Sequence, residues 1–300
     1  MCTLLKTIAY GTRITPTIAK NIIGSFPERS LLDCAQVSFH DVERTSITRL
    51  HNGHYPSISA VLGCTQSQQQ LYWWQLKMIK QLGGLAAFRK YMRERIDLGV
   101  RYHSFIQQLL TSWRKDGGNI SEIHHRLLEK LDDGISGYAR SASHILFSLQ
   151  LSNEMRLEQF TTHHRLCYHG RFDAIIRYKD ALFLMDWKTS SSGSKKEQSS
   201  VLSTMYNDPL QIAAYIGAVN SDPVYSDLPK IANGAVVVAK ESGVCATVVE
   251  MNFREIEFLF GYRQLFQDYW QKWLKCLKKF WGELESRPSS QGTVSFISSG

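Results

Sequence analysis

A short apolar run that ends abruptly in charged residues constrains the fold of this chain most strongly. The run extends from Leu182 to Met185 without alternation, and Asp186, Trp187 and Lys188 follow it directly. Uninterrupted apolar strands are typical of strands covered on both faces of a sheet. Because strand side chains alternate, Asp186 and Lys188 point to one face and Trp187 points to the other. We therefore expect a central strand with layers on both sides and a charged end.

The rest of the chain divides into a mostly helical first part and a β-rich second part. The pattern predicts helices that begin at residue 57, cover 68–82, continue to 110 after Gly83-Gly84, and cover 120–132, 136–150, 208–220 and 254–284. Strands are expected at 155–162, 165–178, 181–188, 234–240 and 245–251. The order predicts an α/β fold, in which a mixed central sheet is flanked by helices and an N-terminal helical region arches over the sheet.

The length of 300 residues and 43% hydrophobic content allow one sizeable core. We expect a single domain over residues 30–285, with a mostly helical part (30–150) and a core that carries the chemistry (151–285). Residues 1–29 contain basic residues and only one acid, which is typical of a mitochondrial presequence, although an ordinary disordered leader is the alternative. The serine-rich tail over 286–300 is expected to be disordered.

Charge and cysteine usage narrow the classes of partner and cofactor only modestly. A net charge of +8 is compatible with nucleic acid but is shared by proteins of many other functions. The six cysteines form no C-x-x-C pair, which indicates free thiols in a reducing compartment. No apolar run reaches the roughly 18 residues of a membrane helix, so we expect no membrane association. We also expect a monomeric protein.

The charged strand end forms a candidate catalytic site together with Asp173, which lies in Gly170-Arg171-Phe172-Asp173 on the preceding strand. Two neighbouring carboxylates repel one another unless a hard divalent cation lies between them, which indicates Mg²⁺ or Mn²⁺. Lys188 would then position or help to deprotonate an attacking water. The alternative is an exposed ion pair between Asp186 and Lys188 at a strand end. The upstream G-x-x-D and the trailing Thr189-Ser190 favour the catalytic interpretation.

These residues resemble the RecB-type branch of the PD-(D/E)XK nucleases, whose core reads G-x-x-D and then D-[YW]-K-T. His103 resembles the histidine that adds a metal ligand in this branch, although a lone histidine is more often structural. Gln211 and Tyr215 match its Q-x-x-x-Y element, and their spacing places them on one helix face. The resemblance implies a PD-(D/E)XK, restriction-endonuclease-like fold, in which the face of Gln211 and Tyr215 touches nucleic acid beside the active site.

For the site, the resemblance implies metal ligation by His103, Asp173, Asp186 and the backbone carbonyl of Trp187, with Lys188 as the catalytic cation. It narrows to exonucleases that act on mitochondrial DNA. It thus implies a single-stranded DNA exonuclease of the mitochondrial matrix that needs free ends, trims flaps and linear fragments, and meets the mitochondrial replication machinery.

The chain departs from some relatives of this branch. It lacks the four flanking cysteines of relatives with an iron–sulfur cluster and any G-x-x-x-x-G-K-[ST] loop, so we expect neither that cluster nor a nucleotide cofactor. Two alternatives stay open: a structure-selective endonuclease, and a catalytically silent protein that binds single-stranded DNA.

Several further residues are weaker candidates. Ser57 and Ser59 are either phosphate contacts near a helix N-terminus or caps. Arg101 belongs to a basic and aromatic segment, residues 89–102, that is either a single-strand contact or a solvated helix face. Glu158 could hydrogen-bond a metal-bound water. The lysines of the last helix are expected to form a solvated face.

Overall fold

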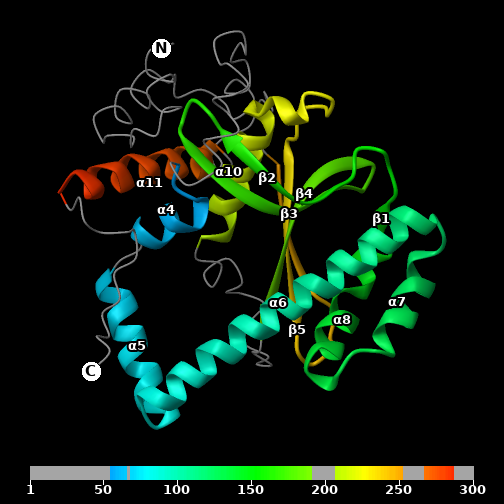
Figure 1. The fold of residues 1–300 in the computed structure, drawn as a ribbon, viewed down its shortest axis with the longest axis horizontal. Coiled ribbons are helices and arrows are strands. Elements are labelled where there is room, and N and C mark those ends of the chain that lie inside the picture. Colours follow the sequence, from blue (N-terminus) through cyan, green and yellow to red (C-terminus); the bar gives the residue numbers. More distant parts are fainter. Residues whose placement is uncertain (1–54, 66–67, 191–206, 253–266, 287–300) are drawn as a thin grey trace, which may run out of the picture.

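The computed structural model describes residues 55–65, 68–190, 207–252 and 267–286. Over these residues the chain forms a mixed sheet with helices on both faces, which confirms the expected α/β fold (Figure 1). The strand order is β1-β3-β4-β5-β6, with β2 also paired to β3. Strands β4 and β5 are parallel, and the other pairs are antiparallel. The strands are β1 (Leu149–Gln150), β2 (Arg156–His163), β3 (Tyr168–Tyr178), β4 (Ala181–Ser190), β5 (Asn233–Lys240) and β6 (Thr247–Asn252).

Strand β4 is the central strand that the apolar run predicted. Leu182 and Leu184 pack on one face with residues of the helices α4, α10 and α11, while Phe183, Met185 and Trp187 pack on the other face with residues of α6, α7 and α8. The strand is therefore apolar throughout because both of its faces are buried.

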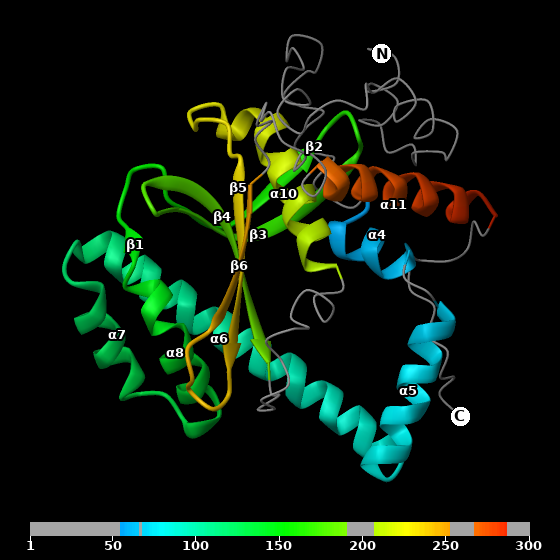
Figure 2. The same cartoon turned by 180° about the vertical axis from the view of Figure 1, so that it is seen from behind.

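Two layers of helices enclose the sheet (Figure 2). One layer consists of α4 (Ile58–Thr65), α10 (Asp208–Ser221) and α11 (Gln267–Ser286), and the short 3-10 helix η4 (Pro223–Tyr225) follows α10. The opposite layer consists of α6 (Leu85–Asp116), α7 (Ile120–Leu128) and α8 (Asp133–Leu146). On α11 the predicted division holds, since Trp270, Trp273 and Phe280 are buried and the lysines at 272, 275, 278 and 279 are exposed.

The long helix α6 connects the body of the molecule to α5 (Gln68–Leu82). Gly83 and Gly84 separate these helices with φ values of 84° and 138°, which glycine adopts readily. In both views the C-terminal part of α6 lies against the sheet, and its N-terminal part projects away from the sheet to meet α5 (Figures 1 and 2). The N-terminal helical region therefore forms an arm beside the sheet.

Several expected helix boundaries were wrong, and the helix expected to end at residue 110 continues to Asp116. The helix expected over 120–132 ends at Leu128, and the next begins at Asp133 because the Asp132 carboxylate caps it by accepting a hydrogen bond from the Gly134 N–H at 3.0 Å. That helix ends at Leu146 instead of residue 150. Residues 149–150 form β1 because their backbone pairs with β3, a long-range contact that the local pattern cannot show.

The strand expected over 165–178 begins at Tyr168, since Cys167 adopts a φ of 56° in the turn after β2. Strand β4 continues to Ser190, two residues past its expected end, because it pairs with β5 from Phe183 to Ser190. The expected leader and the start of the last helix at 254 lie outside the described residues. So does the expected tail, except for Ser286, which ends α11.

Candidate active site

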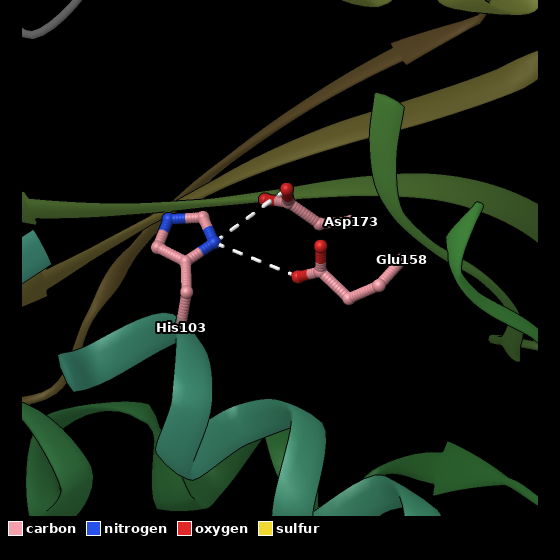
Figure 3. Close-up of side chains that lie close together, drawn as sticks. All are labelled: His103, Glu158 and Asp173. Carbon is pink, nitrogen blue, oxygen red and sulfur yellow. Dashed lines mark ion pairs between the residues drawn. The ribbon is translucent and has the colours of Figure 1, made fainter. Parts of the chain in front are cut away.

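Three side chains from separate elements converge beside the sheet (Figure 3). His103 lies on α6, Glu158 on β2 and Asp173 on β3. The His103 Nδ1 atom is 3.5 Å from Oδ1 of Asp173 and 3.9 Å from Oε1 of Glu158. Figure 3 shows the imidazole ring pointing at both carboxylates. The three side chains are partly exposed, so the group is open to solvent.

The backbone of β2 places Glu158 in this group. Regular pairing between β2 and β3 on either side of the position puts Glu158 opposite Asp173. The φ of Glu158 is 50°, a left-handed value that costs a non-glycine residue about 1–3 kcal/mol and often marks a functional site. The Arg171 Nε donates to Glu158, with Nε 3.0 Å from the carboxylate Oε2 and 3.3 Å from the backbone carbonyl. Arg171 thus holds both the side chain and the backbone of Glu158.

Asp173 is fixed by the neighbouring central strand. The backbone N–H of Trp187 donates a hydrogen bond to Oδ2 of Asp173 at 2.8 Å. The Trp187 indole is buried on the face of the sheet that α6, α7 and α8 cover. This bond leaves Oδ1 directed at His103. The local geometry therefore presents one oxygen of Asp173 to the group.

Asp186 and Lys188 form a buried pair on β4. The Lys188 Nζ atom is 2.7 Å from Oδ2 of Asp186 and 4.0 Å from Oδ1 of Asp208 at the start of α10. Nζ also donates to Oε1 of Gln211 at 3.2 Å. The Asp186 side chain is 3% exposed and that of Lys188 30% exposed, so the pair is not the solvated ion pair that was the alternative interpretation.

Gln211 and Tyr215 of α10 lie beside this pair, on one helix face as predicted. The Gln211 Nε2 donates to the Tyr215 hydroxyl at 3.2 Å, so Tyr215 orients the amide that contacts Lys188. The Tyr215 ring packs over Gly170, where a Cβ atom would come within 2.5 Å of the ring. The glycine of the G-x-x-D motif is therefore needed because α10 approaches β3 so closely.

The net effect of burial and neighbouring charges is to raise the pKa values of both His103 and Asp186. Burial lowers the pKa of His103, but its attraction to the carboxylates of Asp173, Glu158 and Asp186 outweighs burial and raises the pKa to about 10. Burial raises the pKa of Asp186 despite the nearby Lys188 charge. Without a cation, the site therefore retains protons to offset its concentration of carboxylates.

The group of His103, Glu158 and Asp173 fits a hard divalent cation. The three ligand atoms lie within 4.8 Å of one another. Two ligands of one Mg²⁺ ion lie at most about 4.2 Å apart, twice the bond length, and both distances from His103 fall within that limit. Oxygen and imidazole ligands suit Mg²⁺ or Mn²⁺. A bound cation would displace the proton from His103.

The predicted ligand set overlaps with this group only in part. His103 and Asp173 belong to it, and Glu158, which we expected only as a partner of a bound water, joins them. Among the described residues Asp186 is not in the group, and its carboxylate is paired with Lys188. Ligation by Asp186 and by the Trp187 carbonyl stays a prediction. The sequence predicted the strand that carries Glu158, but it did not predict the left-handed backbone conformation of this residue.

The weaker candidates occupy other surroundings. The Ser57 Oγ accepts a hydrogen bond from the Ala60 N–H at 3.1 Å, as a helix cap does, and Ser59 is exposed on α4. Arg101 pairs with Asp132 and, at 3.7 Å, with Asp97. Contacts of Ser57, Ser59 and Arg101 with DNA stay predictions, and these partners offer a structural reason for Ser57 and Arg101.

A comparison of the sequence with known protein families gives the class of protein to which this fold and site belong. The profile of the PD-(D/E)XK nuclease superfamily matches residues 72–291. The chain belongs to this superfamily. Within the described residues, no helix combines the length and the apolar character needed to cross a membrane.

Particular relatives are proteins named mitochondrial genome maintenance exonuclease 1. The human protein is 32% identical over 228 residues, which is 75% of this chain and 58% of the relative. The protein of Xenopus tropicalis is 29% identical over 243 residues, 80% of this chain and 61% of the relative. The mouse protein is 28% identical over 234 residues, 77% and 60% respectively. The chain thus spans about three fifths of the length of these relatives.

Proposed function

We propose that this protein is a metal-dependent exonuclease that hydrolyses phosphodiester bonds of single-stranded DNA from free ends. The observation that carries the proposal is the buried Lys188–Asp186 pair beside the group of His103, Glu158 and Asp173. A cation held near a mostly buried lysine is an arrangement suited to a charged phosphodiester. Membership of the PD-(D/E)XK superfamily supports the same reaction class.

The residues of the site divide the work of hydrolysis. A divalent cation, when bound, would polarise the scissile phosphate and lower the pKa of a water. His103, Glu158 and Asp173 would hold it, and the Trp187 N–H keeps Asp173 in place. Lys188, held by Asp186 and Gln211, offers its positive charge to the phosphate or to the attacking water. Each group thus acts from a position that the sheet or α10 fixes.

The finer features of the proposal rest on the relatives and on composition. The names of the three relatives contain the words mitochondrial and exonuclease, which supports a place in mitochondrial DNA maintenance and a requirement for ends. We infer a location in the mitochondrial matrix, trimming of flaps and linear fragments there, contact with the replication machinery and a monomeric state. The net charge of +8 suits a polyanionic substrate.

A comparison of linear and circular single-stranded DNA, with Mg²⁺ or with a chelator, tests the proposal. We expect mononucleotides or short oligonucleotides from linear DNA with Mg²⁺, no product with chelator, and intact circles. Cleavage of circles would identify a structure-selective endonuclease. Binding without any cleavage in Mg²⁺ or Mn²⁺ would identify a silent single-strand binder. Labelled RNA of the same sequence and double-stranded DNA with a flap complete the substrate set.

A further inference from the structure

The N-terminal half of α6 carries an exposed surface on the side of His103. Ile96 and Val100, seven and three residues before His103, are 63% and 60% exposed. Arg93 and Arg89, about one and two turns further from His103 than Ile96, are exposed as well. We name these four residues the α6 stripe: Arg89, Arg93, Ile96 and Val100.

Helix geometry places the stripe on the face that leads to His103. At about 100° per residue, the four positions lie within roughly 20–80° of His103 around the helix axis. The path along the stripe from Arg89 to His103 rises by 14 residues, which is about 21 Å along the axis. A nucleic-acid strand approaching His103 along this face would meet each of the four side chains in turn. At a minimum of about 3.4 Å per nucleotide, the stripe has room for at most about six nucleotides.

The charges of α6 are segregated around the same axis. Glu94 lies roughly 180° from His103, and Asp97 lies roughly 120° from it, about 40° beyond Arg93 at the edge of the stripe. Both acids pair with cations outside the stripe, Glu94 with Lys90 at 3.7 Å and Asp97 with Arg101 at 3.7 Å. The stripe itself contains arginines and aliphatic residues without an acid. Its charge is therefore complementary to a polyanion, and its aliphatic side chains offer contact to bases.

We propose that the α6 stripe is the surface that binds the single strand next to the scissile phosphate, with Arg89 and Arg93 contacting phosphates and Ile96 and Val100 contacting base faces. This inference rests on the proposed function, because it assigns the substrate of the same site. The arm formed by α5 and α6 projects from the sheet (Figure 1). The residue predicted from the sequence as the DNA contact of this segment, Arg101, lies on the opposite face.

Binding measurements without divalent metal test the stripe apart from catalysis. We expect Arg89→Gln/Arg93→Gln to weaken binding of labelled oligothymidylates and to reduce the slope of log affinity against log salt by about 0.7 for each phosphate that is no longer bound. Ile96→Ser/Val100→Ser should weaken binding about three- to tenfold with an unchanged salt slope, because these side chains carry no charge. Arg93→Lys in place of Arg93→Gln should restore about half of the lost slope, because one of the two cations is then present again.

Matched controls come from the same chain. Lys90→Gln removes an exposed cation that lies outside the stripe, roughly 140° from His103 around the helix axis, and Val224→Ser removes a valine that is 65% exposed on η4. Both controls should bind as the unsubstituted protein does. Circular dichroism melts show whether each variant is folded. We expect all of them to fold, because substitutions at exposed positions usually change stability little.

Kinetics with Mg²⁺ separate this inference from the proposed function. Stripe variants should raise KM for oligonucleotides about three- to tenfold while leaving hydrolysis of bis(p-nitrophenyl) phosphate unchanged, because that diester is too small to reach the stripe. Stripe variants that bind and cleave oligonucleotides like the two controls would overturn the inference, even with an active enzyme. An unsubstituted protein that cleaves no diester would overturn the proposed function, and the metal-free binding data would still decide the role of the stripe.

Discussion

The backbone N–H of Trp187 donates a hydrogen bond to Oδ2 of Asp173 at 2.8 Å, so the central strand itself holds the carboxylate that faces His103. The bond joins β4 to β3 through a side chain next to the last backbone pairing between the strands, Ala174 with Met185. It therefore links the stability of the sheet end to the geometry of the candidate metal site. Substitutions of Asp173 should separate the two contributions.

Asp173→Asn and Asp173→Ala should both abolish cleavage but differ in stability. Asparagine retains an oxygen that accepts from the Trp187 N–H, whereas alanine leaves this partly buried donor without its partner. We expect the alanine variant to be less stable than the asparagine variant by about 1–3 kcal/mol in urea unfolding. Equal stabilities would show that the hydrogen bond contributes nothing to the sheet end.

Substitution of Lys188 or Asp186 should remove activity because each residue holds the other in place. Lys188→Ala or Asp186→Ala should give a folded protein without Mg²⁺-dependent cleavage. Removal of one partner from a buried pair costs about 3–5 kcal/mol, while replacement of both by neutral residues is often close to neutral. Asp186→Asn/Lys188→Met should therefore recover stability in denaturant titrations without recovering activity. Normal turnover by any of these variants would contradict the proposed site.

Glu158 should contribute to metal affinity, although its own backbone conformation is strained. Glu158→Gln should raise the Mg²⁺ concentration for half-maximal activity about 10–100-fold, and excess Mg²⁺ should restore much of the rate. Calorimetric titration with Mn²⁺ measures the same loss without substrate. An unchanged metal dependence would show that Glu158 is not a ligand.

The strain at Glu158 predicts a second, independent result. Its φ of 50° suits glycine better than any residue with a Cβ atom. Glu158→Gly should therefore be more stable than Glu158→Ala by about 1 kcal/mol, although both lack the carboxylate and should show the same weakened metal binding. A thermal or urea unfolding comparison of the two variants provides the measurement.

His163 should make the protein sensitive to acid. It is fully buried between Tyr168 and Trp270, and burial lowers its pKa from 6.5 to about 3. Below pH 6.5 the unfolded chain binds a proton on His163, whereas the folded protein does not bind it until the pH falls to about 3. Stability should thus fall by up to about 1.4 kcal/mol per pH unit from pH 6.5 towards pH 3, and this contribution levels off below pH 3.

An asparagine at this position provides the control for the acid effect. The His163 Nδ1 atom accepts a hydrogen bond from the Leu166 N–H at 3.2 Å, which the Asn oxygen can replace without titrating. His163→Asn should show a shallower loss of stability between pH 6.5 and about 4 than the unsubstituted protein in urea unfolding. Parallel curves would exclude His163 as the source of acid sensitivity.

Local patterns were enough to predict the elements that carry the site. The run from Leu182 to Met185 identified the central strand, because an uninterrupted apolar segment of that length requires cover on both faces. The i, i+4 spacing of Gln211 and Tyr215 placed them on one helix face, where the structure shows them in contact with each other and, through Gln211, with Lys188. Boundaries failed where long-range pairing decided them, as for β1.

By itself, the sequence determined the α/β fold class, the family resemblance and the choice of Asp173, Asp186 and Lys188, because side-chain alternation and motif spacing are properties of the local chain. Only the tertiary structure decided that Glu158 joins His103 and Asp173, since the left-handed turn in β2 and its alignment with β3 bring that carboxylate into place. It also decided which side of α6 faces the site. That choice, which separates Arg93 from Arg101, depends on how the helix packs against the sheet, and packing is a relationship between distant segments.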